Sequence, residues 1–195
     1  AIVRKFKTLG YKNIITIEKK KLDLRDQKKV FKYLKKIKPE GVIIAAAKVG
    51  GIHSNNTFKA DFIYNNLAIQ NNLIHGSYLC NVKNLIFLGS SCVYPKNSKQ
   101  PIKEKYLLSG KLEETNDAYA VAKIAGIKLC EKINLQYNLN YKCLMPSNSY
   151  GPNDNYDDFN SHFLPALIKK VNYAKNKKHK KIILWGSGEP RREMI

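Results

Sequence analysis

Residues 41–47 read Gly-Val-Ile-Ile-Ala-Ala-Ala, and residues 85–89 read Leu-Ile-Phe-Leu-Gly. Unbroken apolar runs of this length are typical of strands that are buried on both faces of a parallel sheet. Residues 58–80, and a segment from Tyr119 to about Tyr137, have the length and apolar spacing of helices. Strands and helices that alternate in this way predict an α/β fold with a doubly wound parallel sheet.

The same alternation extends toward both ends of the chain. Further strands are predicted at residues 13–17, 141–145 and 182–185, and further helices at residues 26–37 and 161–174. The first residues, Ala-Ile-Val-Arg-Lys-Phe, suit a helix and lack an initial Met, so we expect an internal part of a longer protein. At 195 residues and 44% hydrophobic content, we expect one domain over residues 1–195.

Composition narrows the class of protein. The formal charge is +20, but all except four of the 35 basic residues are Lys, spread along the chain. We therefore expect no nucleic-acid partner. The alternative to an enzyme is a basic protein that keeps only the fold and binds nucleic acid or has a regulatory role. No apolar run is long enough to cross a membrane, and no signal peptide is recognised. The four cysteines (Cys80, Cys92, Cys130, Cys143) form no CxxC pair, which favours reduced thiols in a cytoplasmic protein and predicts no metal site.

Three polar residues indicate carbonyl chemistry. Ser90 follows the run at residues 85–89, so it lies beyond the carboxyl end of a strand, where parallel sheets bind ligands. Tyr119 and Lys123 are four positions apart and project from one side of a helix. We expect the Lys123 cation to lower the pKa of the Tyr119 phenol toward neutral pH. The Ser90 hydroxyl could then hold a carbonyl oxygen while Tyr119 delivers or removes its proton.

Other features are not explained by that pattern. Cys92 lies two positions after Ser90, although carbonyl reduction needs no thiol. The glycine-rich turn that opens a dinucleotide-binding fold is not found in the sequence, because Gly50-Gly51 lacks the required spacing. Asp23 has two interpretations, a partner for an adenine amino group or a helix N-cap, and we leave both open. The irregular stretch at residues 94–116 is predicted to be a functional loop.

Several segments together resemble the GDP-L-fucose synthases, a family of extended short-chain dehydrogenases/reductases with a Rossmann fold. They comprise residues 45–52, 88–95, 119–126, 145–155, 161–162 and 185–188, in the expected order over essentially the whole chain. The Tyr-x-x-x-Lys pattern alone marks a very large superfamily, whereas the combination is specific. Ser147 and Ser149 stand where we expect Thr and Leu in that family.

The resemblance implies an enzyme that epimerises GDP-4-keto-6-deoxy-D-mannose at two carbons and then reduces it with NADPH to GDP-L-fucose. In the epimerisation it implies that Cys92 acts on the side of the base, which removes a proton, and His162 on the side of the acid, which returns one. Ser90 and Tyr119 would hold the enolate. Tyr119 then donates a proton in the reduction, and Lys123 tunes it and binds the nicotinamide ribose. By residue type alone, Cys92 would more often be a packing residue and His162 a surface residue.

Binding residues are also implied by the resemblance. Those facing NADPH are Leu88, Gly89, Ser90, Ser91, Lys123, Pro146, Ser147, Asn148, Ser149 and His162. Lys170 and Arg192 would bind the diphosphate of the GDP-sugar, and Trp185 would offer a flat face to its base or sugar. The alternatives are a charged helix end for Lys170 and a core position for Trp185.

The resemblance also implies how the complete protein is organised. Residues from about 151 to 195 would begin a substrate-binding lobe, and the full-length protein would be a homodimer. Because the glycine-rich turn and much of that lobe are missing, we expect the 195-residue chain alone to be inactive. The alternative enzymes are a nucleotide-sugar 4-epimerase or 4,6-dehydratase. A dehydratase would carry an Asp-Glu pair where this chain has Ser91-Cys92.

Overall fold

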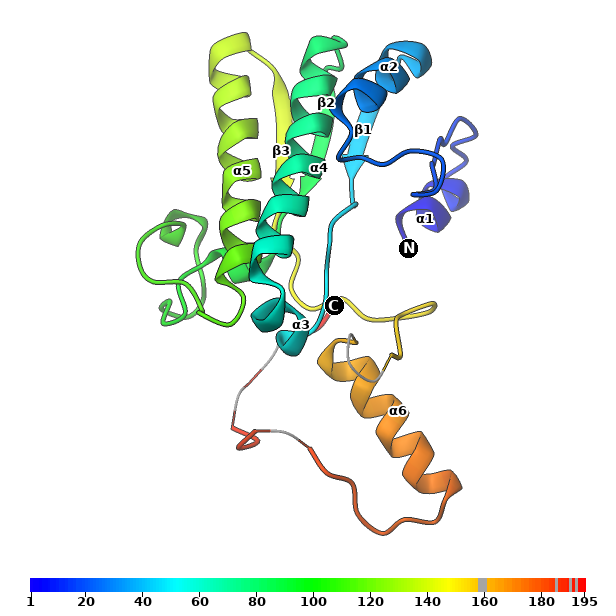
Figure 1. Ribbon diagram of the computed structural model, residues 1–195, viewed down its shortest axis with the longest axis vertical. Helices are drawn as coiled ribbons and strands as arrows, with labels where there is room; N and C mark the ends of the chain where they lie inside the picture. Colours follow the sequence, from blue (N-terminus) through cyan, green and yellow to red (C-terminus); the bar gives the residue numbers. More distant parts are fainter. Residues whose placement is uncertain (158–160, 185, 190, 192) are drawn as a thin grey trace.

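A computed structural model describes residues 1–157, 161–184, 186–189, 191 and 193–195 (Figure 1). Its centre is a three-stranded parallel sheet in the order β1-β2-β3. The strands are β1 (Gly41–Ile44), β2 (Asn84–Leu88) and β3 (Asn140–Leu144). The register places Phe87 of β2 between Ile44 of β1 and Cys143 of β3. The predicted parallel α/β arrangement is therefore confirmed for these strands.

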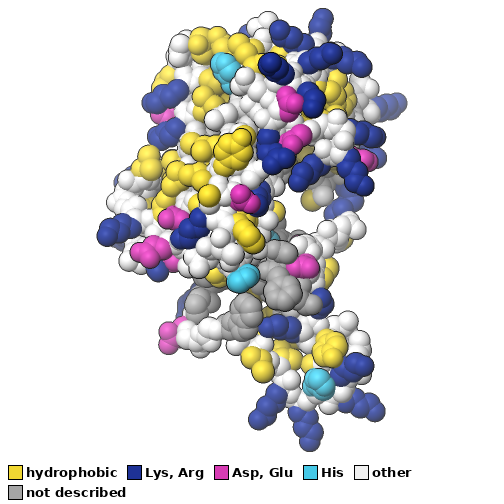
Figure 2. Space-filling view, viewed as in Figure 1, with side chains coloured by type: hydrophobic (Ala, Val, Ile, Leu, Met, Phe, Trp, Pro, Cys, Tyr) yellow, Lys and Arg dark blue, Asp and Glu magenta, His cyan; other side chains and the backbone are white. Residues whose placement is uncertain are grey.

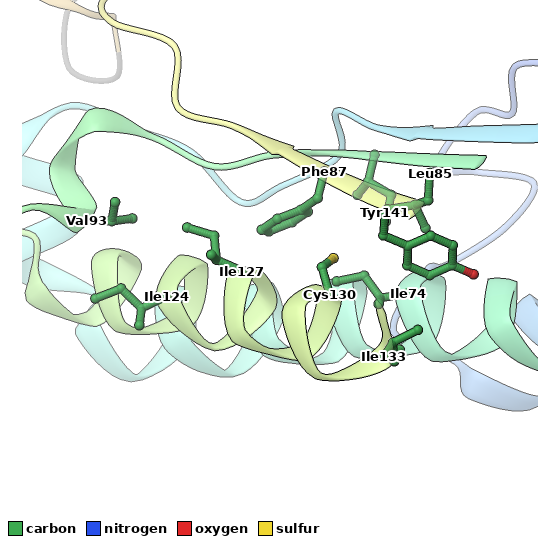
Figure 3. Packing of buried hydrophobic residues seen from close by; sticks show 10 residues of the cluster. Ile74, Leu85, Phe87, Val93, Ile124, Ile127, Cys130, Ile133 and Tyr141 are labelled. Carbon is green, nitrogen blue, oxygen red and sulfur yellow. The ribbon is translucent and has the colours of Figure 1, made fainter. Parts of the chain in front are cut away.

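Two long helices cover one face of this sheet. They are α4 (Lys59–Leu79) and α5 (Asp117–Tyr137), and α2 (Gln27–Ile37) packs against α4 (Figure 1). Between helices and strands lies a core that includes Ile74 from α4, Phe87 from β2 and Tyr141 from β3 (Figure 3). The helices therefore cross from strand to strand over a shared apolar layer, and burial of that layer is the main stabilising contribution.

A glycine sets how closely α5 approaches the sheet. A Cβ atom at Gly126 would lie 2.7 Å from the Phe87 ring, closer than side chains normally come. Only a residue without a side chain allows this approach. The other face of the sheet is more open: Leu144 is 50% exposed, and Lys142 is exposed too. The described helices α4 and α5 thus cover one face, and the doubly wound arrangement stays a prediction.

Two predicted strands are wrong. Residues 13–17 and 182–184 form no strand in the described part of the chain. An apolar run becomes a strand only where a neighbouring strand pairs with it, and β1 pairs only with β2 in the ladders that the structure describes. The fourth residue of the second run, Trp185, lies outside the described residues. Near it, the Ile183 carbonyl accepts a hydrogen bond of 3.0 Å from Lys170 Nζ.

The remaining elements follow the sequence with small shifts. The helix expected at the start is α1 (Ile2–Thr8), and α6 (Phe163–Asn176) begins two residues later than predicted. The ladder of β1 ends at Ile44, so residues 45–47 continue as irregular chain. A short helix that we did not predict, α3 (Ile52–Thr57), precedes α4. The stretch at residues 94–116 holds one 3₁₀ turn, η2 (Glu104–Tyr106).

Two surface properties bear on function. Figure 2 shows Lys and Arg side chains scattered over the visible face, with no single basic patch. Among the described residues, no helix is long and apolar enough to cross a membrane.

Candidate active site

The chain leaves β2 in a turn that holds two of the predicted catalytic residues. Ser90 is extended (φ −164°, ψ 151°) and caps a 3₁₀ turn, η1 (Ser91–Val93). Its Oγ accepts a hydrogen bond of 3.4 Å from the Cys92 backbone N–H. A serine hydroxyl at this position pairs an N–H group that the short turn leaves unsatisfied. Cys92 is thereby fixed next to Ser90 at the carboxyl end of the strand.

The first turns of α5 bring the other two residues to the same place. Lys123 is only 4% exposed, and its Nζ donates a hydrogen bond of 2.7 Å to the Leu88 carbonyl at the end of β2. The ammonium also lies 4.6 Å from the centre of the Phe87 ring and 5.6 Å from that of Tyr119. These distances suit cation–π attraction. The structure therefore gathers Ser90, Cys92, Tyr119 and Lys123 around one end of β2.

Burial dominates the electrostatics of this cluster. It lowers the pKa of the Lys123 ammonium to about 8, while the negative charge of a Cys92 thiolate would oppose that shift. Burial also raises the pKa of the Cys92 thiol, against the hydrogen bond with Ser90 and the charge of Lys123. Both groups are thus held nearer to their neutral forms than they would be in water.

The expectation that the pKa of the Tyr119 phenol is lowered is wrong. Its pKa is raised, first because burial penalises the phenolate and then because a Cys92 thiolate would repel it. Lys123 approaches the ring while its Nζ binds a main-chain oxygen, so its charge does not offset the loss of water. Tyr119 accordingly keeps its proton at neutral pH, and its phenolate is disfavoured.

The two stretches predicted to face a cofactor lie side by side. The Gly89 N–H donates to the Leu144 carbonyl at 2.7 Å, and the Ser91 N–H donates to the Pro146 carbonyl at 3.3 Å. A Cβ at Gly89 would lie 3.2 Å from the same Leu144 oxygen, which explains the glycine. Leu88 supplies the carbonyl that holds Lys123. The strand ends of β2 and β3 thus form one continuous edge.

Residues 147–149 continue this edge. Ser147 Oγ is buried and has no hydrogen-bond partner in the described part of the chain. Asn148 is exposed and pairs with the end of the chain: its backbone N–H and its Nδ2 donate to the Glu193 carbonyl at 3.3 and 3.0 Å. Ser149 is exposed. An unpaired buried hydroxyl is costly, and a ligand hydrogen bond at Ser147 would remove that cost.

No described contact brings His162 or Lys170 into this cluster. His162 is exposed at the N-cap of α6, and no described hydrogen bond or ion pair joins its side chain to Cys92 or Tyr119. Lys170 lies on the exposed side of α6 and binds the Ile183 carbonyl. Trp185 and Arg192 lie outside the described residues. The substrate-binding assignments therefore stay predictions.

One of the two interpretations of Asp23 is wrong. The N-cap of α2 is Asp26, whose carboxylate accepts a hydrogen bond of 3.0 Å from the Lys29 N–H. The Asp23 carboxylate instead binds the Arg25 guanidinium, with the shortest contact at 2.6 Å. That pairing holds the pKa of Asp23 below its usual value. Arg25 in turn donates to Asn65 Oδ1 at 2.9 Å, so Asp23 is fixed at the loop before α2.

Sequence reasoning missed two asparagines that hold the loop after β1. Asn66, 2% exposed, accepts from the Lys48 N–H at 2.9 Å and donates to the Lys48 carbonyl at 3.0 Å. Asn55 donates to the carbonyls of Gly50 and Gly51 at 2.7 and 3.1 Å. Amide side chains that pair both backbone groups of a loop residue fix its position. The available signal for Asn66 was an amide on the apolar face of a predicted helix, whereas Asn55 lies on α3, which was not predicted.

The cluster can protonate a bound carbonyl oxygen and move protons at the carbon next to it. Ser90 and Tyr119 offer hydroxyl donors, Cys92 a thiol and Lys123 a positive charge. The glycine approach at Gly89 and the unpaired hydroxyl of Ser147 fit a dinucleotide lying along the edge formed by β2 and β3. No group of three or more His, Cys, Asp or Glu residues that could hold a metal ion occurs among the described residues.

A parallel α/β sheet with a serine after one strand and a Tyr–Lys pair on the next helix defines the dinucleotide-dependent enzymes of carbonyl chemistry. Within that class, the chain belongs to the NAD dependent epimerase/dehydratase family, whose pattern matches residues 1–195.

Similar proteins narrow this further. The chain is 51% identical over 195 residues to the putative GDP-L-fucose synthase 2 of Arabidopsis thaliana, and covers 100% of itself and 60% of that relative. It is 46% identical to the GDP-L-fucose synthase of Escherichia coli, and the match covers 100% of this chain and 61% of that relative. The chain is thus a homologue of GDP-L-fucose synthases and spans about 60% of their length.

Solved structures of enzymes named for GDP-sugars have the same fold as this chain. A GDP-L-fucose synthetase from Naegleria fowleri, bound to NADP, matches with a TM-score of 0.85 at 30% identity, covering 100% of this chain and 64% of that one. A GDP-D-glycero-L-gluco-heptose synthase from Campylobacter jejuni, in the presence of NADPH, matches with a TM-score of 0.87 at 37% identity, covering 99% and 65%.

Proposed function

We propose that this chain carries the catalytic centre of an enzyme that epimerises GDP-4-keto-6-deoxy-D-mannose and reduces it to GDP-L-fucose. The observation that carries the proposal is the meeting of the Cys92 thiol with Ser90, Tyr119 and Lys123 at one end of β2. A serine hydroxyl and a Tyr–Lys pair are sufficient for reduction, but they do not provide a base for epimerisation. A thiol fixed beside them provides a base for the carbons next to the ketone.

In the first stage, Cys92 removes a proton from a carbon beside the ketone. The enolate oxygen accepts hydrogen bonds from Ser90 and Tyr119, with the Lys123 charge nearby to stabilise it. Inversion requires a new proton on the opposite face of the sugar, and we assign that step to His162. The same groups deprotonate and reprotonate the two carbons beside the ketone, one after the other.

In the second stage, Tyr119 donates its proton to the ketone oxygen. The phenol carries its proton at neutral pH, as this role requires, while its raised pKa makes it a weaker acid than a phenol in water. NADPH, when bound, supplies the hydride to the ketone carbon. Lys123 holds the carboxyl end of β2 in place through its hydrogen bond to the Leu88 carbonyl, and it would bind the nicotinamide ribose.

The binding residues follow from the same edge of the sheet. We propose that Leu88 to Ser91 and Pro146 to Ser149 lie along NADPH, with Ser147 Oγ donating to it. His162 would border both ligands. Lys170, Trp185 and Arg192 would contact the GDP part of the substrate, in a lobe that begins at about residue 151.

We further propose a homodimer in the cytoplasm as the working form. Large apolar side chains project from the two long helices, with Tyr64 on α4 68% exposed and Val121 on α5 43% exposed. A contiguous apolar patch shared by the two helices would mark such an interface. Sedimentation of the full-length protein checks this, and a Tyr64→Lys variant should shift it toward the monomer.

The deciding experiment gives the full-length protein GDP-4-keto-6-deoxy-D-mannose and NADPH and identifies the product. We expect GDP-L-fucose. The chain is also 42% identical over 182 residues to the GDP-L-colitose synthase of Yersinia pseudotuberculosis, so the ketone precursor of GDP-L-colitose is the second substrate to offer. A product reduced at the ketone but inverted at neither carbon would refute the epimerase role. If neither substrate causes NADPH consumption, the reductase role and the proposed overall reaction are both refuted.

A further inference from the structure

Two cysteines that the proposed reaction does not use face each other beneath the site. Cys130 lies on α5, is 0% exposed, and points from the helix toward the strands (Figure 3). Cys143 lies on β3 opposite Phe87 and packs against the same core cluster as Cys130. Gly126, one turn before Cys130 on α5, packs on the Phe87 ring, so Cys130 and Cys143 lie on the same, helix-facing side of the sheet. The consecutive elements α5 and β3 thus bring two cysteines, thirteen positions apart, to the same layer of the core.

The two thiols are not equivalent. The contact between them lowers the pKa of Cys143 and raises that of Cys130, because the Cys130 S–H donates to the sulfur of Cys143. Burial further raises the pKa of Cys130. Since the thiolate is the nucleophile in disulfide exchange, Cys143 is the attacking partner and Cys130 the resolving partner.

A path from solvent reaches only the first of them. Cys143 lines a surface hollow of about 460 Å³, together with Met145, Tyr94 and Lys105. The Lys128–Glu131 ion pair, at 2.7 Å, also borders the hollow. Glu104 lines the hollow as well, so its charged side chains are of both signs and it is open to a small polar disulfide. Cys130 does not line this hollow, so an oxidant has to reach it through Cys143.

We propose that Cys143 and Cys130 form a reversible dithiol–disulfide site, oxidised by small disulfides such as oxidised glutathione. The Cys143 thiolate attacks one sulfur of the oxidant and releases one glutathione thiolate, leaving a mixed disulfide. Cys130 then loses its proton to solvent and attacks the Cys143 sulfur, which releases the second glutathione. Two protein thiols are oxidised by two electrons, and one oxidised glutathione is reduced to two glutathione molecules.

The test treats the folded protein with oxidised glutathione, blocks remaining thiols and maps the tryptic peptides by mass spectrometry. We expect the peptide Leu129–Lys132 joined to the peptide that begins at Cys143, in a product that dithiothreitol reverses. A link to Cys80 or Cys92 instead, or oxidation only after urea unfolds the chain, would overturn the proposal.

Single variants separate the two roles. Cys130→Ala should leave Cys143 as a stable glutathione adduct, because the resolving thiol is gone. Cys143→Ala, at a half-buried position that tolerates the change, should leave Cys130 fully reduced under the same treatment. Cys80→Ala is the matched control and should form the Cys130–Cys143 link at the unchanged rate. Modification of Cys130 in the Cys143→Ala variant would contradict the assigned order. The readout is a mass, so it is independent of the proposed reaction.

Discussion

Lys123 Nζ lies 2.7 Å from the Leu88 carbonyl oxygen, and this hydrogen bond joins the catalytic helix α5 to the end of β2. The lysine is almost fully buried, and the ring of Phe87 lies against its ammonium. A buried ammonium with one neutral acceptor is costly, so the fold maintains a positive charge at this point against its own stability. Such a cost is characteristic of functional sites.

The first prediction is that this charge makes stability rise with pH. The pKa of Lys123 is about 8 in the folded chain against an ordinary 10.5, so between these values the unfolded chain binds more protons. The free energy of unfolding should therefore increase across this window, by about 3 kcal/mol from this one group. Urea titrations of the wild type and of Lys123→Met, from pH 7 to 10, give the difference between the two.

Lys132→Met is the control for that comparison. Lys132 lies on the same helix, but it is exposed and pairs with Glu131 at 2.9 Å. Its substitution should change stability by about 0–1 kcal/mol, as surface ion pairs do. If Lys123→Met and Lys132→Met have the same pH dependence, the buried charge is not the cause.

The second prediction concerns the pH dependence of epimerisation. Because burial raises the pKa of Cys92 above its ordinary 9.0, the thiolate fraction should still be increasing at pH 9. Deuterium uptake from heavy water into the substrate should therefore rise from pH 7 to 9 without levelling. A plateau below pH 8 would contradict Cys92 as the base.

A substitution makes the same point at fixed pH. Cys92→Ser should lower deuterium uptake by about 10²-fold or more, since a serine hydroxyl is a much weaker base. NADPH consumption with the already epimerised ketone should stay within a few-fold of wild type. Cys80→Ser, a half-buried thiol away from the site, is the control and should alter neither rate.

The third prediction is that Gly126→Ala destabilises the protein and disturbs Lys123. The added methyl group would lie 2.7 Å from the Phe87 ring and 3.0 Å from Gln70, so α5 has to move away from the sheet. Overpacking of this kind costs about 1–3 kcal/mol, partly offset by the higher helix propensity of Ala. Thermal unfolding measures the loss. Phe87→Leu in the same chain should recover part of it, and full additivity of the two changes would argue against the clash.

Much of this arrangement could be predicted from the sequence. The apolar runs at residues 41–47, 85–89 and 141–145 did become adjacent parallel strands, at least in their first residues. Ser90 and the pair of Tyr119 and Lys123 met because the ends of parallel strands and the starts of following helices share one edge of the sheet. Local pattern was sufficient for these positions.

Other properties depend on contacts that the sequence does not reveal. Residues 13–17 have the composition of a strand, but strand formation also requires a partner at the right edge. The pKa of Tyr119 was predicted to fall because a lysine lies one turn away, yet the depth of burial decides its direction. The placement of His162 opposite Cys92 is a prediction that still depends on the family resemblance.

The fourth prediction concerns Asn66, which no motif indicated. Asn66→Ala would leave the Lys48 N–H and carbonyl without their partners in a half-buried loop, at a cost of about 1–3 kcal/mol. The loop follows β1 at the edge where the cofactor is proposed to bind, so NADPH affinity should fall as well, by more than the rate of the chemical step. Urea unfolding and a fluorescence titration with NADPH measure the two effects.

Asn65→Ala is the matched control for Asn66→Ala. Asn65 is the neighbouring residue on α4, and its side chain joins Arg25 to the Asp61 carbonyl at the surface. Its loss should cost well under half as much stability, because water replaces exposed hydrogen bonds. NADPH affinity should then separate the two possible roles. If Asn66→Ala lowers stability but binds NADPH as Asn65→Ala does, the loop is held for folding only. If both quantities fall, the amide positions the loop for its ligand.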